Sequence, residues 1–259
     1  MNLRETMIFC EHLAEKASKS IMAIYETNFE VETKSDNSPL TIADKTANDI
    51  IVNALSKQYP QCATLSEELQ DNHIRLSNEY CFIVDPLDGT KEFVSRNGQF
   101  TVNIALSHNG KPVVGVICVP VTGELFSAYE GGGAYYCKPR EAKTSIRVTN
   151  KLDNLIFVGS RSHLGKHEEV LLKEKGDLIA KIVSMGSSLK ACMVAQGLAD
   201  VYYRSGLTHE WDTAAMQCIV EEAGGVFRQM DGSEMRYNRK NTLNDKGFFA
   251  VNRSENIWI

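Results

Sequence analysis

The sequence has little that favours a disulfide-stabilised, membrane-spanning or nucleic-acid-binding protein. Its seven cysteines are scattered and form no C-x-x-C pair, which argues against a disulfide framework and against a thiolate zinc site. No apolar run reaches the roughly 18 residues that a membrane-spanning helix needs. With 28 basic and 33 acidic residues, the net charge of −5 lacks the basic excess that is typical of nucleic-acid-binding proteins.

The N-terminal residues also lack the apolar segment of a signal peptide. Glu5, Glu11 and Glu15 interrupt any such segment. Together with the cysteine usage, this makes the reducing cytoplasm the expected compartment. We expect no transmembrane segment, whereas a peripheral contact with the inner face of the cell membrane leaves little trace in a sequence and stays open.

The first half of the chain is predicted to contain helices followed by antiparallel strands. Residues 3–26 carry apolar side chains at helical spacing, and a second amphipathic helix is expected to begin near Thr41. Short β-rich runs follow, and Asn109-Gly110 between two of them predicts a tight hairpin. We therefore expect a helix-plus-antiparallel-sheet subdomain over residues 1–150.

The second half alternates strand candidates with helices, which is typical of an α/β layer. The helices are predicted at residues 165–175, 187–197 and 212–223. We expect an α/β subdomain over residues 151–259 and a functional site in the cleft between the two halves. The predicted fold class is therefore mixed α/β.

Two carboxylates follow a predicted buried strand in the segment C-F-I-V-D-P-L-D-G-T, residues 81–90. Asp85 ends the apolar run, and Pro86 is expected to stop the strand and to stiffen the backbone. Asp88 and the glycine after it favour a turn. Such a turn would hold both carboxylates toward the same space, where they repel each other unless a cation or a proton lies between them.

The simplest interpretation of these two aspartates is that they satisfy local backbone amides in the turn. Their density at a strand end favours a second interpretation, a Mg²⁺ site completed by a substrate phosphate. Haloacid-dehalogenase-type phosphatases also carry paired aspartates, in a D-x-D-G-T motif. Here the spacing is one residue longer, so that class is a minor alternative.

Three further carboxylates are candidates for the same site, and each has a structural alternative. Glu67 and Glu68 follow a short apolar run. They are either a solvated surface pair or the source of a third carboxylate for a metal cluster. Asp212 stands at the start of a predicted helix, where it is either the N-cap residue or a metal ligand. Asp44 lies three residues after Thr41, either in a capping box or orienting an attacking water.

Polar residues near the predicted third strand–helix unit are candidates for binding an anion. The segment G-S-S-L-K predicts a glycine turn and a helix that begins at Ser187, with Lys190 in its first turn. A flexible surface lysine is the alternative. Arg161 and His163 project from the end of another predicted strand, after Ser160.

Three motifs, S-E-E, D-P-L-D-G-T and W-D-T-A-A, stand in this order over nearly the whole chain. Together they resemble the inositol monophosphatase superfamily of metal-dependent, lithium-sensitive phosphatases. The inositol phosphatases typically have the sequence D-G-T-T-N-F at this motif. The sequence here is D-G-T-K-E-F, which resembles the 3′(2′),5′-bisphosphate nucleotidase branch. The segments S-R-S-H and G-S-S-L-K are similar to that branch as well.

The resemblance implies a layered α-β-α-β-α fold, two or three Mg²⁺ ions and a role for each motif residue. The implied metal ligands are Glu67, Asp85, Asp88, Asp212 and the backbone carbonyl of Leu87. The implied catalytic residues are Asp44 and Thr90, which would orient and activate water, and Glu67, which would reach the water through its metal. The implied substrate contacts are Gly89, Thr90, His163, Ser187, Lys190, Arg204 and Asp212.

The function implied by the resemblance is hydrolysis of the 3′-phosphate of adenosine 3′,5′-bisphosphate to AMP and phosphate, in sulfur assimilation and nucleotide recycling. The partner is then a small nucleotide and not a nucleic-acid polymer. One alternative is an inositol or sugar monophosphatase of the same superfamily. An alternative from another class is a non-catalytic Mg²⁺- or Ca²⁺-dependent binding protein, for which Asp44 and Thr90 would have no obvious purpose.

Overall fold

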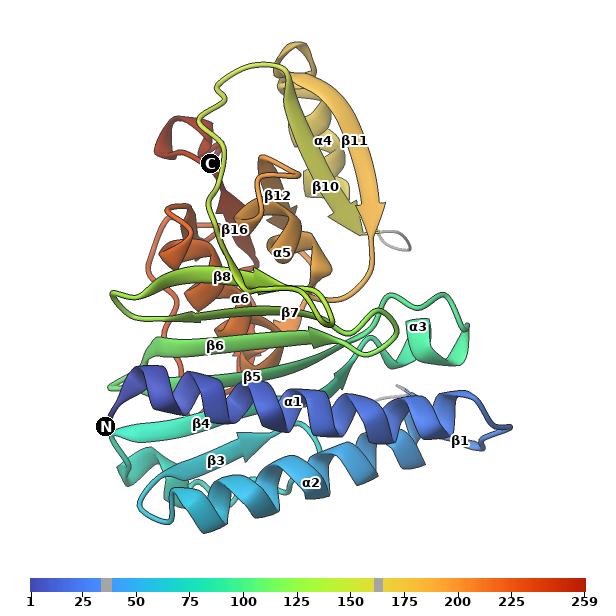
Figure 1. The fold of residues 1–259 in the computed structure, drawn as a ribbon. Helices are drawn as coiled ribbons and strands as arrows, with labels where there is room; N and C mark the ends of the chain where they lie inside the picture. The colour runs from blue at the N-terminus through green and yellow to red at the C-terminus, as the bar shows by residue number, and fades with distance from the viewer. Residues whose placement is uncertain (34–38, 161–164) are drawn as a thin grey trace.

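The computed structural model describes residues 1–33, 39–160 and 165–259. The two large sheets of the described residues and three sets of helices alternate in five layers (Figure 1). The predicted layered α-β-α-β-α fold is therefore confirmed. In the described part of the chain, no helix combines the length and the apolar character that crossing a membrane requires.

The larger sheet joins seven strands of the described chain in sequence order, and its neighbours run antiparallel except for the parallel first pair. The strands are β3 (Ala63–Ser66), β4 (Tyr80–Asp88), β5 (Thr101–His108), β6 (Lys111–Val119), β7 (Glu124–Tyr129), β8 (Gly133–Cys137) and β9 (Thr144–Ile146). The predicted hairpin joins β5 to β6. Asn109 and Gly110 both have positive φ, 50° and 79°, as a two-residue hairpin turn favours.

Helices α1 (Leu3–Tyr25) and α2 (Ile42–Gln58) lie side by side on one face of this sheet (Figure 1). Both faces of the larger sheet are buried, and successive side chains of β4 point alternately to one face and to the other. Phe82 and Val84 pack with α1 and α2, whereas Cys81 and Ile83 pack into the core on the other face.

Helices α5 (Leu189–Ala195) and α6 (Glu210–Glu222) cover that other face. The approach of α6 to β6 depends on Gly115. A Cβ atom there would lie 2.5 Å from the backbone oxygen of Ala215 on α6, so no larger residue fits without moving the helix.

The smaller sheet lies beyond α5 and α6, and helix α4 (Lys166–Glu174) covers its outer face. Its strand order is β11 (Ile179–Met185), β10 (Leu155–Ser160), β12 (Val201–Arg204), β16 (Phe248–Val251) and β14 (Val226–Gln229). Strand β10 runs parallel to both of its neighbours, as expected for an α/β layer. The short elements are β1 (Val31–Thr33), β2 (Pro39–Thr41), α3 (Thr90–Val94), β13 (Thr208–His209), β15 (Leu243–Asn244) and 3₁₀ turns at Ile74–Ser77, Gly176–Leu178 and Ser254–Asn256.

Two predicted helix starts were wrong by two residues. Helix α5 begins at Leu189 and not at Ser187, because Ser187 has a left-handed backbone with φ 44°. Helix α6 begins at Glu210 and not at Asp212, because His209 is its N-cap. We propose a subdomain boundary near residue 150, since the larger sheet ends at Ile146 and the smaller sheet begins at Leu155.

Candidate active site

Three aspartates from the two halves of the chain meet where β4 ends and α6 begins. One carboxylate oxygen from each of Asp85, Asp88 and Asp212 lies within 4.8 Å of the other two. Asp85 continues the alternation of Cys81 and Ile83, so its side chain faces α6. This meeting agrees with the expectation that these residues share one site.

The three carboxylates repel one another when they are ionised and no positive charge lies between them. Burial, and then the adjacent carboxylates of Glu67 and Asp88, raise the pKa of Asp85 well above its ordinary value. Burial, and then Asp88, raise the pKa of Asp212 to about 8. Closely spaced hard oxygen donors that hold protons in this way fit a divalent cation such as Mg²⁺, which would remove the repulsion.

The turn after Asp85 serves local structure as well as the cluster. The Leu87 N–H donates to Asp85 Oδ1 at 3.1 Å, which is the local amide contact of an Asx turn. The expectation that the strand stops at Asp85 was wrong. Strand β4 continues to Asp88, which pairs with Thr101 after an irregularity in the register, so Pro86 lies in a bulge and not beyond the strand.

Glu67 and Leu87, the other two metal ligands implied by the resemblance, contact residues of the same region. Glu67 directly follows β3, its backbone N–H donates to Val84 O at 3.2 Å, and its carboxyl group hydrogen-bonds with that of Asp85. The Leu87 side chain is buried in the core beneath α1 and α2, while its carbonyl oxygen accepts a hydrogen bond from the Thr90 hydroxyl at 3.3 Å.

Asp44 makes two sets of contacts, one within the capping box and one with Thr90. Its Oδ2 accepts hydrogen bonds from the backbone N–H and the hydroxyl of Thr41, which confirms the predicted capping box. Its Oδ1 accepts a hydrogen bond from the Thr90 hydroxyl at 3.1 Å. One side chain therefore both caps α2 and contacts the turn that carries Asp88.

Gly89 is the N-cap residue of α3 and has φ 92°, a conformation that favours glycine. A Cβ atom at this position would also lie 3.3 Å from the backbone oxygen of Gln99. The sharp bend brings Gly89 and the N-terminal residue of α3, Thr90, directly after Asp88.

A polar cavity of about 240 Å³ extends from the aspartates toward the smaller sheet. Its predicted lining residues are Asp88, Gly89, Ser187, Lys190, Arg204 and Asp212. The structure thus brings these predicted substrate contacts together. His163 and Arg161 lie outside the described residues.

Lys190 is a buried cation beneath this cavity, with 5% of its surface exposed. Its ammonium group donates to Ser187 O at 2.6 Å and lies 5.5 Å from the centre of the Tyr202 ring. Burial lowers the pKa of Lys190 to about 8, while Asp88 opposes this shift and Arg204 adds to it. The alternative of a flexible surface lysine is wrong, because the side chain is enclosed.

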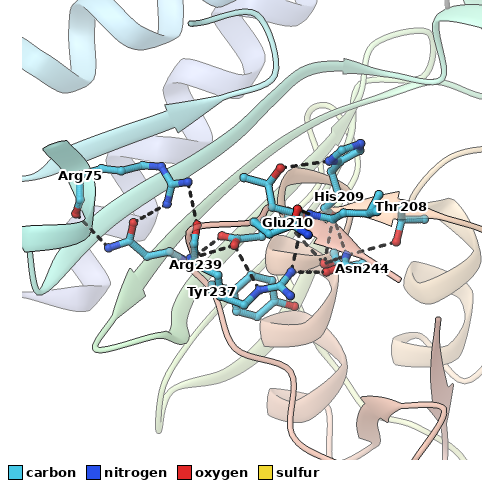
Figure 2. A network of polar contacts seen from close by, with 12 residues as sticks. Arg75, Thr208, His209, Glu210, Tyr237, Arg239 and Asn244 are labelled. Atoms are coloured by element: carbon cyan, nitrogen blue, oxygen red, sulfur yellow. Dashed lines mark hydrogen bonds and ion pairs between the residues drawn. The ribbon is translucent and has the colours of Figure 1, made fainter. Parts of the chain in front are cut away.

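A polar network fixes the start of α6 and was missed by sequence reasoning (Figure 2). Glu210 is fully buried and accepts hydrogen bonds from the backbone N–H groups of Asn238 and Arg239 at 2.6 and 2.9 Å. Arg75 donates to the Asn238 side chain and to Arg239 O, each at 2.8 Å. The first turn of α6, which carries Asp212, is therefore tied to two distant loops.

The prediction that Asp212 is the N-cap of α6 was wrong. Asp212 is the third residue of the helix, and its Oδ2 accepts a hydrogen bond from the His209 backbone N–H in a capping box. On the other side, Asn244 Nδ2 donates to His209 O at 2.7 Å and to Thr208 Oγ1 at 3.1 Å (Figure 2).

Comparisons with known proteins agree with this geometry. The model of the inositol monophosphatase family matches residues 2–257. The chain is 38% identical to the 3′(2′),5′-bisphosphate nucleotidase CysQ of Escherichia coli K12, over 91% of this chain and 95% of the relative. The crystal structure of CysQ from Bacteroides thetaiotaomicron matches with a TM-score of 0.81 and 42% identity, covering 93% of this chain and 95% of that one. An IMPase from Thermotoga maritima matches with a TM-score of 0.80 and 26% identity, over 96% and 92% of the two chains. The chain belongs to the inositol monophosphatase family.

Proposed function

We propose that this protein is a metal-dependent phosphatase that hydrolyses the 3′-phosphate of adenosine 3′,5′-bisphosphate to AMP and phosphate. The observation that carries the proposal is the placement of an aspartate cluster beside a cavity whose lining includes three basic side chains, Lys91, Lys190 and Arg204. The CysQ relatives, which are named bisphosphate nucleotidases, support the same substrate. We assign the activity to the cytoplasm, where seven unpaired cysteines would stay reduced.

The metal ligands in this proposal are Glu67, Asp85, Asp88, Asp212 and the carbonyl oxygen of Leu87. Two or three Mg²⁺ ions bound there would supply an activated water and neutralise the charge that develops during an in-line displacement. The chain's own contribution is to hold the carboxylates rigidly. The capping box of Asp212 and the Asx turn of Asp85 both restrict these side chains in advance.

Thr90 and Asp44 are suited to orienting the attacking water. The Thr90 hydroxyl has one proton and two acceptors within reach, Asp44 Oδ1 at 3.1 Å and Leu87 O at 3.3 Å. With the proton directed at the nearer, charged Asp44, the oxygen lone pairs of Thr90 remain to accept a hydrogen bond from a water molecule. The half-buried Glu67 lies beside Asp85, and we propose that it reaches the same water through its metal. Gly89 and Thr90 would offer backbone N–H groups to the phosphate at the bend before α3.

The cations favour a nucleotide bisphosphate over the alternative of an inositol or sugar monophosphate. Beyond the scissile phosphate, an inositol ring is neutral, whereas a nucleoside bisphosphate carries a second phosphate that Lys190 and Arg204 can pair with. Ser187 and Asp212 would contact the sugar part of the substrate, as both line the cavity. The haloacid-dehalogenase alternative is set aside, because the family match covers nearly the whole chain.

Lys190→Met tests this assignment of the cationic side of the cavity. Loss of one charged hydrogen bond to substrate costs about 1.5–3 kcal/mol, so KM for the bisphosphate should rise about 10- to 100-fold. The KM for inositol 1-phosphate and the kcat for the bisphosphate should change much less. In the unchanged protein, KM should also rise as the pH passes about 8, because the Lys190 ammonium then loses its proton.

The control is Lys181→Met, which removes an exposed lysine from β11. It should leave both KM values unchanged. If Lys190→Met had an unaltered KM for the bisphosphate, Lys190 would not contact the substrate, and the nucleotide assignment would lose its main structural support.

A further inference from the structure

We infer that Ser188 is a positioning residue that holds the carboxylate of Asp88 in the orientation needed to bind metal. The inference rests on the proposed metal-dependent function and extends it to a residue with no assigned role. Ser188 lies in the C-terminal half of the chain, far from Asp88 in the sequence, and contacts it through its backbone N–H and its hydroxyl.

Four hydrogen-bond donors converge on a single oxygen of Asp88. The backbone N–H and the hydroxyl of Ser188 both donate to Asp88 Oδ2 at 2.7 Å. Thr101 Oγ1 and Asn103 Nδ2 approach the same oxygen at 3.3 Å. A carboxylate oxygen has about two lone-pair sites, so Oδ2 is fully engaged by the protein. The other oxygen, Oδ1, would then be the one that remains to hold a metal ion.

The direction of the Ser188 hydroxyl is determined by its surroundings. The hydroxyl has one proton and two acceptors within reach, Asp88 Oδ2 at 2.7 Å and Asp212 O at 3.4 Å, and the shorter contact to a charged oxygen is the stronger. Asn103 Nδ2 donates to the Ser188 oxygen at 2.9 Å, which leaves the serine proton free to point at Asp88.

The Ser188 side chain does not cap a helix, although its position would allow this. Ser188 is the N-cap residue of α5, where a serine side chain commonly accepts a hydrogen bond from the helix backbone. Here its side chain makes no capping hydrogen bond and is directed at Asp88 instead. This choice of partner points to a role in the site and not in the stability of α5.

Water is not able to replace these contacts easily. Ser188 and Thr101 are each 0% exposed, and Asn103 is 1% exposed. Removing the Ser188 hydroxyl therefore takes away one of the two shortest contacts to the half-buried Asp88 carboxylate, which is then held less firmly in one orientation. Partners that orient metal ligands in this way typically contribute about 10- to 100-fold to metal affinity or activity.

The test is Ser188→Ala, with metal binding measured without substrate by calorimetric titration of Mg²⁺ and by Mn²⁺ electron paramagnetic resonance. We expect the metal dissociation constant to rise about 10- to 100-fold. At saturating Mg²⁺, the KM for adenosine 3′,5′-bisphosphate should stay nearly unchanged while kcat falls. Thr101→Val, which keeps the shape of the side chain and removes a second donor to Asp88, should weaken metal binding in the same direction.

Ser127→Ala is the matched control, since it removes an equally buried hydroxyl from β7. It should leave the metal dissociation constant unchanged. Wild-type metal affinity in both Ser188→Ala and Thr101→Val would overturn the inference, even if phosphate release confirmed the proposed function. Weakened metal binding in both variants would support it, even if the wild-type protein released no phosphate. A wild-type protein that bound neither ion would overturn both.

Discussion

Asp88→Asn is expected to abolish turnover while leaving the protein folded. The substitution replaces an anionic ligand by a neutral amide of nearly the same size at the centre of the aspartate cluster. Loss of a metal-ligand charge should remove on the order of 4 kcal/mol of transition-state stabilisation, which is about a thousandfold in kcat/KM. The measurement is phosphate release from adenosine 3′,5′-bisphosphate at saturating Mg²⁺.

Without metal, Asp88→Asn is expected not to lower the stability of the protein, although it abolishes turnover. Asp88 contributes to the repulsion that raises the pKa values of Asp85 and Asp212, so removing its charge should leave the metal-free melting temperature unchanged or higher. Addition of Mg²⁺ should then stabilise the variant less than the wild type. Asp153→Asn, the same change at an exposed position, is the control. Wild-type turnover by Asp88→Asn would remove the basis of the metal-cluster assignment.

Thr90→Val is expected to lower kcat about 100- to 1,000-fold while preserving metal binding. Valine keeps the shape of threonine but lacks the hydroxyl that joins Asp44 to the expected position of the water. Positioned groups that manage a proton in this way typically contribute about 10²- to 10⁴-fold. Because Thr90 is not among the proposed metal ligands, Mg²⁺ titration should give a dissociation constant close to that of the wild type.

Two companion variants define the outcome for Thr90. Thr90→Ser keeps a hydroxyl and should recover most of the rate. Thr46→Val removes a hydroxyl that bonds Ile42 O on α2, and it should have no effect on kcat. If Thr90→Val and Thr90→Ser had equal rates, the hydroxyl would have no part in orienting the water.

Features governed by local chemistry could be predicted from the sequence. The Thr41 capping box, the hairpin at Asn109-Gly110 and the first helix each depend on neighbouring residues, and each appears where it was expected, to within a residue. The aspartates could be proposed as one site because motif resemblance supplied the long-range information. Spacing alone does not bring Asp88 and Asp212 together.

Features governed by distant contacts could not be predicted in this way. Aspartate is a favoured N-cap residue, so the sequence suggested that α6 begins at Asp212. The helix begins earlier because the buried Glu210 is stabilised by backbone groups at Asn238 and Arg239, more than 25 residues away. The role of Ser188 depends on Asp88, at a separation of 100 residues, and no local pattern indicates it.

The proposed metal-dependent nucleotidase activity is tested first by phosphate release from adenosine 3′,5′-bisphosphate and from inositol 1-phosphate, side by side, with Mg²⁺ and then with EDTA. We predict rapid release from the bisphosphate, little release from inositol 1-phosphate, and loss of both activities with EDTA. A preference for inositol 1-phosphate would keep the metal chemistry and contradict the roles given to Lys190 and Arg204. Equal release with and without EDTA would contradict the metal-dependent mechanism itself.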